Sequence, residues 1–144
     1  MNFLLVIVLM LVLAGVQARL PAIAGLRIEF LPAIVAYSAL TFKQGRAIFC
    51  AFAAGCLQDA LSAGPFGVTA CAYAIAALVI TNLGTVLDRN LPFVPLLAGS
   101  IAAVAGAIGA FCIIGVTGAA LLKLTGIALI AGLITIPVFL VADA

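Results

Sequence analysis

The acidic side chain of Asp59 is the strongest candidate for chemistry in this sequence. It lies between two apolar runs, and no basic residue lies within a dozen positions on either side of it. It also comes at the end of a predicted helix, where the helix dipole disfavours an anion. A carboxylate kept between apolar segments is costly and usually has a role. The other acids, Glu29, Asp88 and Asp143, lie close to basic residues or at the chain end.

Two interpretations of Asp59 follow from its position. The carboxylate could be a proton or ion site, or it could be a staple whose oxygens accept hydrogen bonds from Ser62 or from the free N–H groups of the next helix. Gly64, Pro65 and Gly67 suit a tight connection into that helix. Because side-chain oxygens commonly satisfy helix ends, we favour the staple. We therefore predict a structural or partner-binding loop formed by Asp59, Ser62, Gly64, Pro65 and Gly67.

Catalysis and cofactor binding are not expected. The sequence contains no histidine, so its serines have no histidine partner and the commonest metal ligand is missing. It has no nucleophile-elbow, zinc-protease or phosphate-loop motif. The four cysteines match no zinc or redox spacing and are interpreted as small apolar residues inside helices. We predict a protein that is not an enzyme, with no catalytic residue, cofactor or metal.

The composition indicates a membrane protein. The chain is 68% hydrophobic and only 7% charged, whereas soluble domains have about 45–50% apolar and about 25% charged residues. Its surface must therefore face lipid. A spanning helix needs about 20 apolar residues, which predicts an all-α integral membrane protein. Residues 1–144 are expected to form a single transmembrane domain of about six helices, some of them short. The sequence has no basic run, so nucleic acid is not an expected partner.

The apolar runs place the six predicted helices at residues 3–16, 30–42, 47–57, 68–83, 93–114 and 125–141. The first run has no basic residue before it, so we expect a retained helix and not a signal peptide. The second and third are short for a bilayer core about 30 Å thick. Polar residues separate them, which predicts a sharp turn at residues 43–46.

Small residues recur four positions apart on the last two predicted helices. Residues at this spacing let two helix backbones approach closely, either inside one bundle or against a partner helix. The predicted helix-packing or partner face is made of Gly99, Ala103, Gly106, Ala128 and Gly132.

Charge does not decide the orientation in the membrane. With six spans, Lys43, Arg46 and Arg89 fall on one side and the remaining three basic residues, Arg19, Arg27 and Lys123, fall on the other. The positive-inside rule, which places basic loops in the cytoplasm, therefore favours neither orientation.

The stretch of residues 27–90 resembles the bacterial rod shape-determining protein family MreD. The resemblance rests on Phe30-Leu-Pro32, on Tyr37, on the turn that ends at Arg46, and above all on Gly55-Cys-Leu-Gln-Asp-Ala-Leu-Ser-Ala-Gly-Pro-Phe-Gly-Val68. In that family a glycine-containing helix ends in an aspartate, followed by a leucine, a serine and a glycine, and a further glycine opens the next helix. The first, fifth and sixth predicted helices agree only in length and hydrophobicity. The high alanine content, the absence of tryptophan and the short C-terminal tail depart from the family.

The resemblance implies a non-enzymatic scaffold of five or six helices in the bacterial inner membrane. Both termini would be cytoplasmic, and the loop from Asp59 to Gly67 would face the periplasm. The implied partner is an MreC-like protein with a single span and a large periplasmic domain. Together they would couple MreB filaments to peptidoglycan synthesis in the elongation complex, with RodA and a class B transpeptidase as direct or indirect partners.

An alternative from another class is the substrate-binding S-component of an energy-coupling-factor vitamin transporter, which is also small, apolar and six-helical. Such a site needs a few convergent polar groups around a cavity. Outside the turns the chain offers mainly Tyr37, Ser38, Thr41, Tyr73, Thr81, Asn82, Ser100 and Thr135. A proton-coupled carrier that uses Asp59 is a third, weaker hypothesis.

Overall fold

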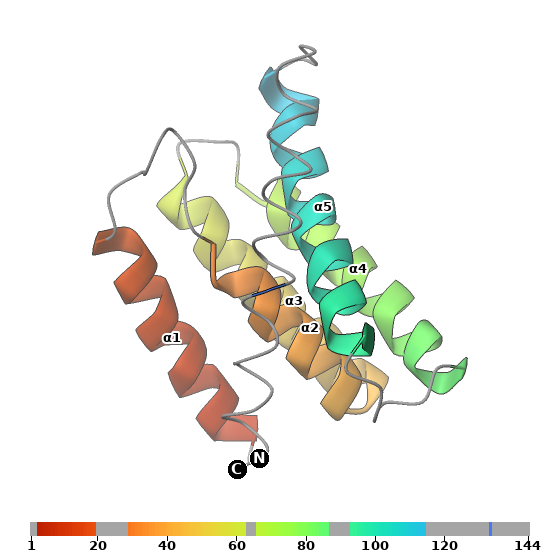
Figure 1. Ribbon diagram of the computed structural model, residues 1–144. Helices are drawn as coiled ribbons and strands as arrows, with labels where there is room; N and C mark the ends of the chain where they lie inside the picture. The colour runs from red at the N-terminus through yellow and green to blue at the C-terminus, as the bar shows by residue number, and fades with distance from the viewer. Residues whose placement is uncertain (1–2, 20–28, 63–65, 87–92, 115–132, 134–144) are drawn as a thin grey trace.

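The computed structural model describes residues 3–19, 29–62, 66–86, 93–114 and residue 133. In these residues every regular element is an α-helix, as predicted (Figure 1). The helices are α1 (Phe3–Arg19), α2 (Leu31–Thr41), α3 (Gln44–Leu61), α4 (Val68–Val86) and α5 (Phe93–Ile114). The sixth predicted helix, residues 125–141, lies outside the described part apart from residue 133.

The predicted helix boundaries agree best with the structure where the apolar runs begin and end sharply. The bounds of α5 agree with the prediction, and α4 begins at Val68 as expected. The prediction was wrong for α3, which begins at Gln44 and includes most of the predicted polar turn. Its exposed first turn accommodates polar side chains without leaving the helical conformation. The helix therefore has 18 residues and not the eleven or so of its apolar run.

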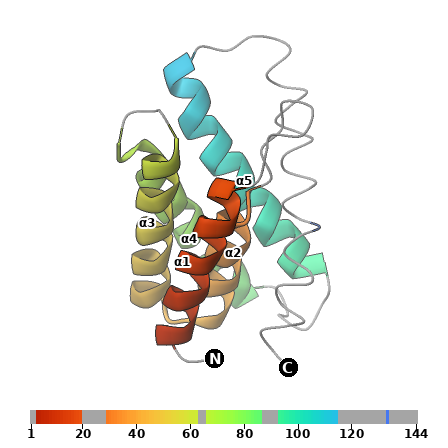
Figure 2. The same ribbon diagram turned by 90° about the vertical axis from the view of Figure 1, so that its left-hand side faces the viewer.

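Helix α2 occupies the centre of the bundle. Its residues from Leu31 to Leu40 are all buried, and it contacts α1, α3, α4 and α5 (Figures 1 and 2). A helix that is apolar on all sides is expected to be surrounded in this way. Pro32 lies in its first turn, where the missing N–H costs no hydrogen bond. With 11 residues, α2 is about 16 Å long at 1.5 Å per residue.

Helices α3 and α4 form the most extensive pair. Gly55 makes their close approach possible. A Cβ at this position would lie 2.2 Å from the Cα of Ala70 and 2.8 Å from the carbonyl oxygen of Thr69. Glycine therefore lets the backbone of α3 rest on the first turn of α4, in the manner of small residues in other membrane helix pairs.

The outer surface of the bundle is apolar. Helix α1 buries only Val6, Met10 and Ala14, and it lies beside α2 and α3 at the edge of the molecule (Figure 1). Large exposed apolar side chains cover the outside of several helices, including Leu4, Val8, Leu11, Val12, Phe49, Phe52, Ile75, Val79 and Ile108. Large exposed apolar surfaces mark regions that face lipid or a partner. In the described residues one helix segment, Val68–Thr85, is long and apolar enough to cross a membrane, and Phe3–Arg19, Leu31–Thr41 and Phe93–Ile108 are shorter apolar helices.

Candidate functional site

The carboxylate of Asp59 binds the start of α4. Asp59 lies in the last turn of α3 and is 4% exposed. Its Oδ2 accepts hydrogen bonds from the backbone N–H of Gly67 at 2.7 Å and of Ala70 at 3.4 Å, and its Oδ1 accepts one from Thr69 at 3.3 Å. These are N–H groups for which the first turn of a helix has no internal partner. Asp59 therefore caps α4 from a neighbouring helix.

This arrangement resolves the electrostatic difficulty seen in the sequence. An anion at the C-terminal end of α3 is unfavourable, but the same anion at the N-terminal end of α4 is favourable. Both helix ends meet at Asp59, and the direct N–H contacts are made with α4. The favourable interaction of the carboxylate with the start of α4 therefore offsets its unfavourable interaction with the end of α3.

The other residues of the predicted loop have different structural roles. The sequence offered two kinds of donor to the Asp59 carboxylate, the Ser62 hydroxyl and the backbone N–H groups of the next helix. In the structure the backbone N–H groups bind it. The Ser62 hydroxyl instead donates to the backbone carbonyl of Asp59 at 3.2 Å, which helps to end α3. Gly67 has a φ of +102°, a backbone conformation that side chains disfavour. Gly64 and Pro65 lie outside the described residues.

A second polar contact, which the sequence analysis missed, lies beside this site. The Gln17 side chain at the end of α1 donates to Oε1 of Gln58 at 2.9 Å and accepts from the N–H of Phe30 at 3.1 Å. It thus joins α1 to α3 and to the start of α2. The only signal in the sequence is a glutamine at the end of each of two apolar runs. Their spacing says nothing of the pairing, because 41 positions separate them.

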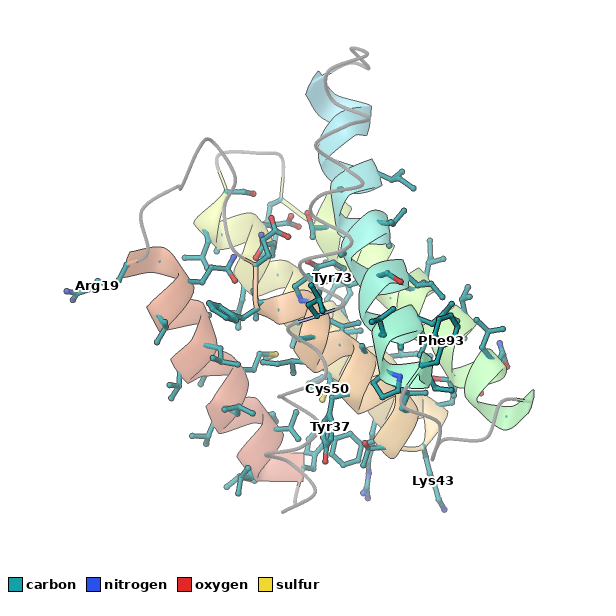
Figure 3. All side chains as sticks on the ribbon, in the orientation of Figure 1. Arg19, Tyr37, Lys43, Cys50, Tyr73 and Phe93 are labelled. Carbon is teal, nitrogen blue, oxygen red and sulfur yellow. The ribbon has the colours of Figure 1, made fainter. Side chains whose placement is uncertain are left out.

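The described charged residues are divided between the two ends of the bundle. Arg19 and Lys43 lie at opposite ends (Figure 3). Glu29 and Asp59 belong to the end with Arg19, where α1 and α3 finish and α2 begins. Arg46 lies in the first turn of α3 beside Lys43, and both are exposed. The acidic groups described here therefore lie at one end, away from this basic pair.

The predicted small-residue face of α5 is turned inward in the described part of the chain. Gly99, Ala103 and Gly106 are all buried. A Cβ at Gly106 would lie 2.6 Å from Cε1 of Tyr73 in α4, so this glycine makes room for the tyrosine ring. Gly106 thus has a packing contact within the bundle, while partner docking on this face stays a prediction. Ala128 and Gly132 lie outside the described residues.

Three of the hydroxyl groups considered for a vitamin site donate to backbone carbonyls. Ser38 donates to the carbonyl of Val35, Thr81 to those of Ala39 and Ala77, and Ser100 to that of Leu97. A crevice between α2, α4 and α5 has a wholly apolar lining of Leu40, Ile80, Leu83, Gly84, Val94, Leu97, Ala98 and Ile101. Such a crevice offers no convergent polar groups to a vitamin. In the residues that the structure describes, no three potential metal ligands gather.

Comparison with known proteins extends the resemblance beyond the central stretch. The sequence model of the family described as rod shape-determining protein MreD matches residues 1–141. The match therefore includes the first and fifth helices, which had agreed only in length and hydrophobicity. No curated protein and no solved structure matches the chain.

Proposed function

We propose a scaffold role in cell elongation for this chain, which belongs to the MreD family of rod shape-determining membrane proteins. Members of this family determine cell shape and are not enzymes. The proposed role is to bind an MreC-like single-span protein in the bacterial inner membrane. Through that partner the chain would help to couple MreB filaments to peptidoglycan synthesis, with RodA and a class B transpeptidase contacted directly or indirectly.

The observation that supports this role is the loop between α3 and α4, because the same segment carries the most specific resemblance to the family. Asp59 fixes the N–H of Gly67 at 2.7 Å. The residue before it, Phe66, is 70% exposed. A large apolar side chain on a backbone that is already fixed loses little entropy when it binds, and aromatic residues often dominate binding interfaces. We therefore assign the partner contact to this loop, with Phe66 as its anchor.

A comparison of two phenylalanines tests the assignment. Phe93 is 62% exposed and begins α5 at the end of the bundle that bears Lys43 (Figure 3), so it is a matched control for Phe66. The full chain would be extracted in mild detergent and the recovery of its single-span partner measured. Phe66→Ala should lower recovery several-fold, and Phe93→Ala should leave it unchanged. Equal recovery with the two variants would mean that Phe66 only faces lipid.

The same proposal includes a topology. Residues 1–144 form one transmembrane domain with both termini in the cytoplasm, the turn with Lys43 and Arg46 on the cytoplasmic side, and the Asp59–Gly67 loop on the periplasmic side. This choice depends on the family, because the basic residues are divided equally between the two sides. A reporter that is active only in the periplasm should give no signal when fused after Ala144. A strong signal would mean an odd number of spans or inverted insertion.

A further inference from the structure

Two basic side chains lie next to each other at the start of α3. Lys43 directly precedes the helix and Arg46 lies in its first turn, and both are exposed. The backbone N–H of Arg46 donates to the carbonyl oxygen of Lys43 at 2.9 Å, so the helical turn fixes the spacing of the two residues. Side chains at these two positions of a helix start can reach one another, and like charges at this distance repel. The pair therefore forms a small patch of concentrated positive charge.

The described part of the chain brings no acidic side chain to this patch. Its acidic residues, Glu29 and Asp59, belong to the opposite end of the bundle, where Arg19 lies (Figure 3). An anion from outside the chain would relieve the repulsion between the two cations. The planar guanidinium of arginine can form two parallel hydrogen bonds with a phosphate group, and a lysine adds a point charge. The patch thus has the chemistry of a phosphate site.

An exposed aromatic surface continues from the basic pair along the outside of α3. Phe49 and Phe52 are 59% and 48% exposed. They follow Arg46 at intervals of three residues, so each side chain lies next to the one before it on the helix surface. Phe52 lies about 9 Å further along the helix axis than Arg46, at 1.5 Å per residue. The Phe49 ring also lies beside that of Phe3 at the start of α1, with centroids 6.3 Å apart. The surface thus changes from cationic to apolar within about two turns.

We propose that an anionic phospholipid binds here, with its phosphate group on Lys43 and Arg46. One of its acyl chains would lie along Phe49 and Phe52. A phospholipid carries a negative headgroup and an apolar chain in the order in which this surface carries cations and aromatic rings, whereas an acidic protein segment would match only the cations. Basic residues near helix ends commonly reach to the headgroup level, and basic groups beside membrane helices bind lipid headgroups. The site depends on the membrane location of the family and not on the scaffold role or on the leaflet in which it lies.

Native mass spectrometry of the full chain in a mild non-ionic detergent tests the headgroup contact. Delipidated protein would be titrated with phosphatidylglycerol, which is anionic, or with phosphatidylcholine of identical acyl chains. Phosphatidylglycerol should bind several-fold more tightly. Arg46→Gln should lower its affinity about fivefold, as expected for one basic residue near an anionic lipid surface. Arg19→Gln is the matched control, because it removes an exposed arginine from the other end, and it should leave the affinity unchanged. Equal binding of the two lipids, or equal losses in the two variants, would overturn the proposal.

The acyl-chain contact is tested by a second pair of variants. Phe52→Ala should lower the affinity for phosphatidylglycerol several-fold. Ile108→Ala on α5 should not, although Ile108 is exposed to a similar extent, at 52% against 48% for Phe52. Equal affinities of the two variants would contradict an acyl chain on α3.

Two further results would replace the lipid with another ligand. Glycerol phosphate has the anionic group without an acyl chain, so it should compete with the lipid only at a far higher concentration. Competition at the concentration of the lipid itself would indicate a site for free phosphate. Unchanged lipid binding by Arg46→Gln, together with loss of a copurifying protein, would indicate that the basic pair contacts an acidic protein. Either result would overturn the proposal.

Discussion

Oδ2 of Asp59, in the last turn of α3, accepts a hydrogen bond of 2.7 Å from the backbone N–H of Gly67, which precedes α4. One side chain therefore joins the end of one helix to the start of the next. Gly55, one turn before Asp59, allows the two backbones to come close enough for this bond. Asp59 and Gly55 hold the end of α3 against the start of α4, and the exposed Phe66 directly precedes Gly67, whose N–H binds Asp59.

Substitutions of Asp59 should destabilise the protein in a definite order. Asp59→Asn should be mild, because its remaining carbonyl oxygen can still accept from Gly67 and Ala70. Asp59→Ala should cost about 1–2 kcal/mol, as the loss of a helix cap does. Asp59→Lys should be worst, since it places a cation at free N–H groups. Thermal unfolding in detergent gives the order. Equal loss of cell function in Asn and Ala variants that both fold normally would instead indicate that Asp59 must ionise for function.

Gly55→Ala should destabilise the α3–α4 pair strongly. The new Cβ would lie 2.2 Å from a backbone atom of Ala70, which cannot move aside as a flexible side chain could. Overpacking of this kind typically costs about 1–3 kcal/mol. Gly45→Ala in the same helix is the control, because a Cβ there meets no atom within 4 Å. Alanine at Gly45 should be neutral or slightly stabilising. A similar unfolding temperature for the two variants would refute the close packing at Gly55.

Gly106→Ala should destabilise the isolated protein, because the added methyl group collides with the Tyr73 ring. The unfolding temperature of the purified chain measures this effect without any partner. Partner recovery should fall only as far as the folded fraction falls. If Gly106→Ala abolishes partner recovery while the purified chain unfolds at the normal temperature, then this face serves docking and not internal packing.

The Gln17–Gln58 contact should hold α1 against the bundle. Gln17→Ala should cost about 0.5–1.5 kcal/mol, the usual net contribution of a hydrogen bond. Combined with Gln58→Ala, the loss should be smaller than the sum of the two single losses, because each variant already breaks the shared bond. Gln44→Ala is the control, as Gln44 is exposed in the first turn of α3. Additive losses at Gln17 and Gln58 would show that the two amides do not interact.

Residue types predicted some of these features better than others. The interpretation of Asp59 as a cap needed only a carboxylate at a helix end, a glycine-rich connection and an apolar helix after it. The part played by Gly55 could not be predicted in this way, since it depends on the rotation of α3 against α4. The Gln17–Gln58 pair was missed for a related reason: a contact between distant helices leaves no local pattern. The start of α3 was misplaced because polar residues suit both a turn and the exposed first turn of a helix.

The most direct test of the account compares partner recovery by Asp59→Ala and Asp59→Asn at a temperature where both variants are folded. In the proposed function, the Asp59 cap fixes the loop that binds a single-span partner. Asp59→Ala should therefore lose most of the partner during mild detergent extraction, and Asp59→Asn should retain most of it. Full retention of the partner by folded Asp59→Ala would contradict the account, because the loop would then bind without its cap.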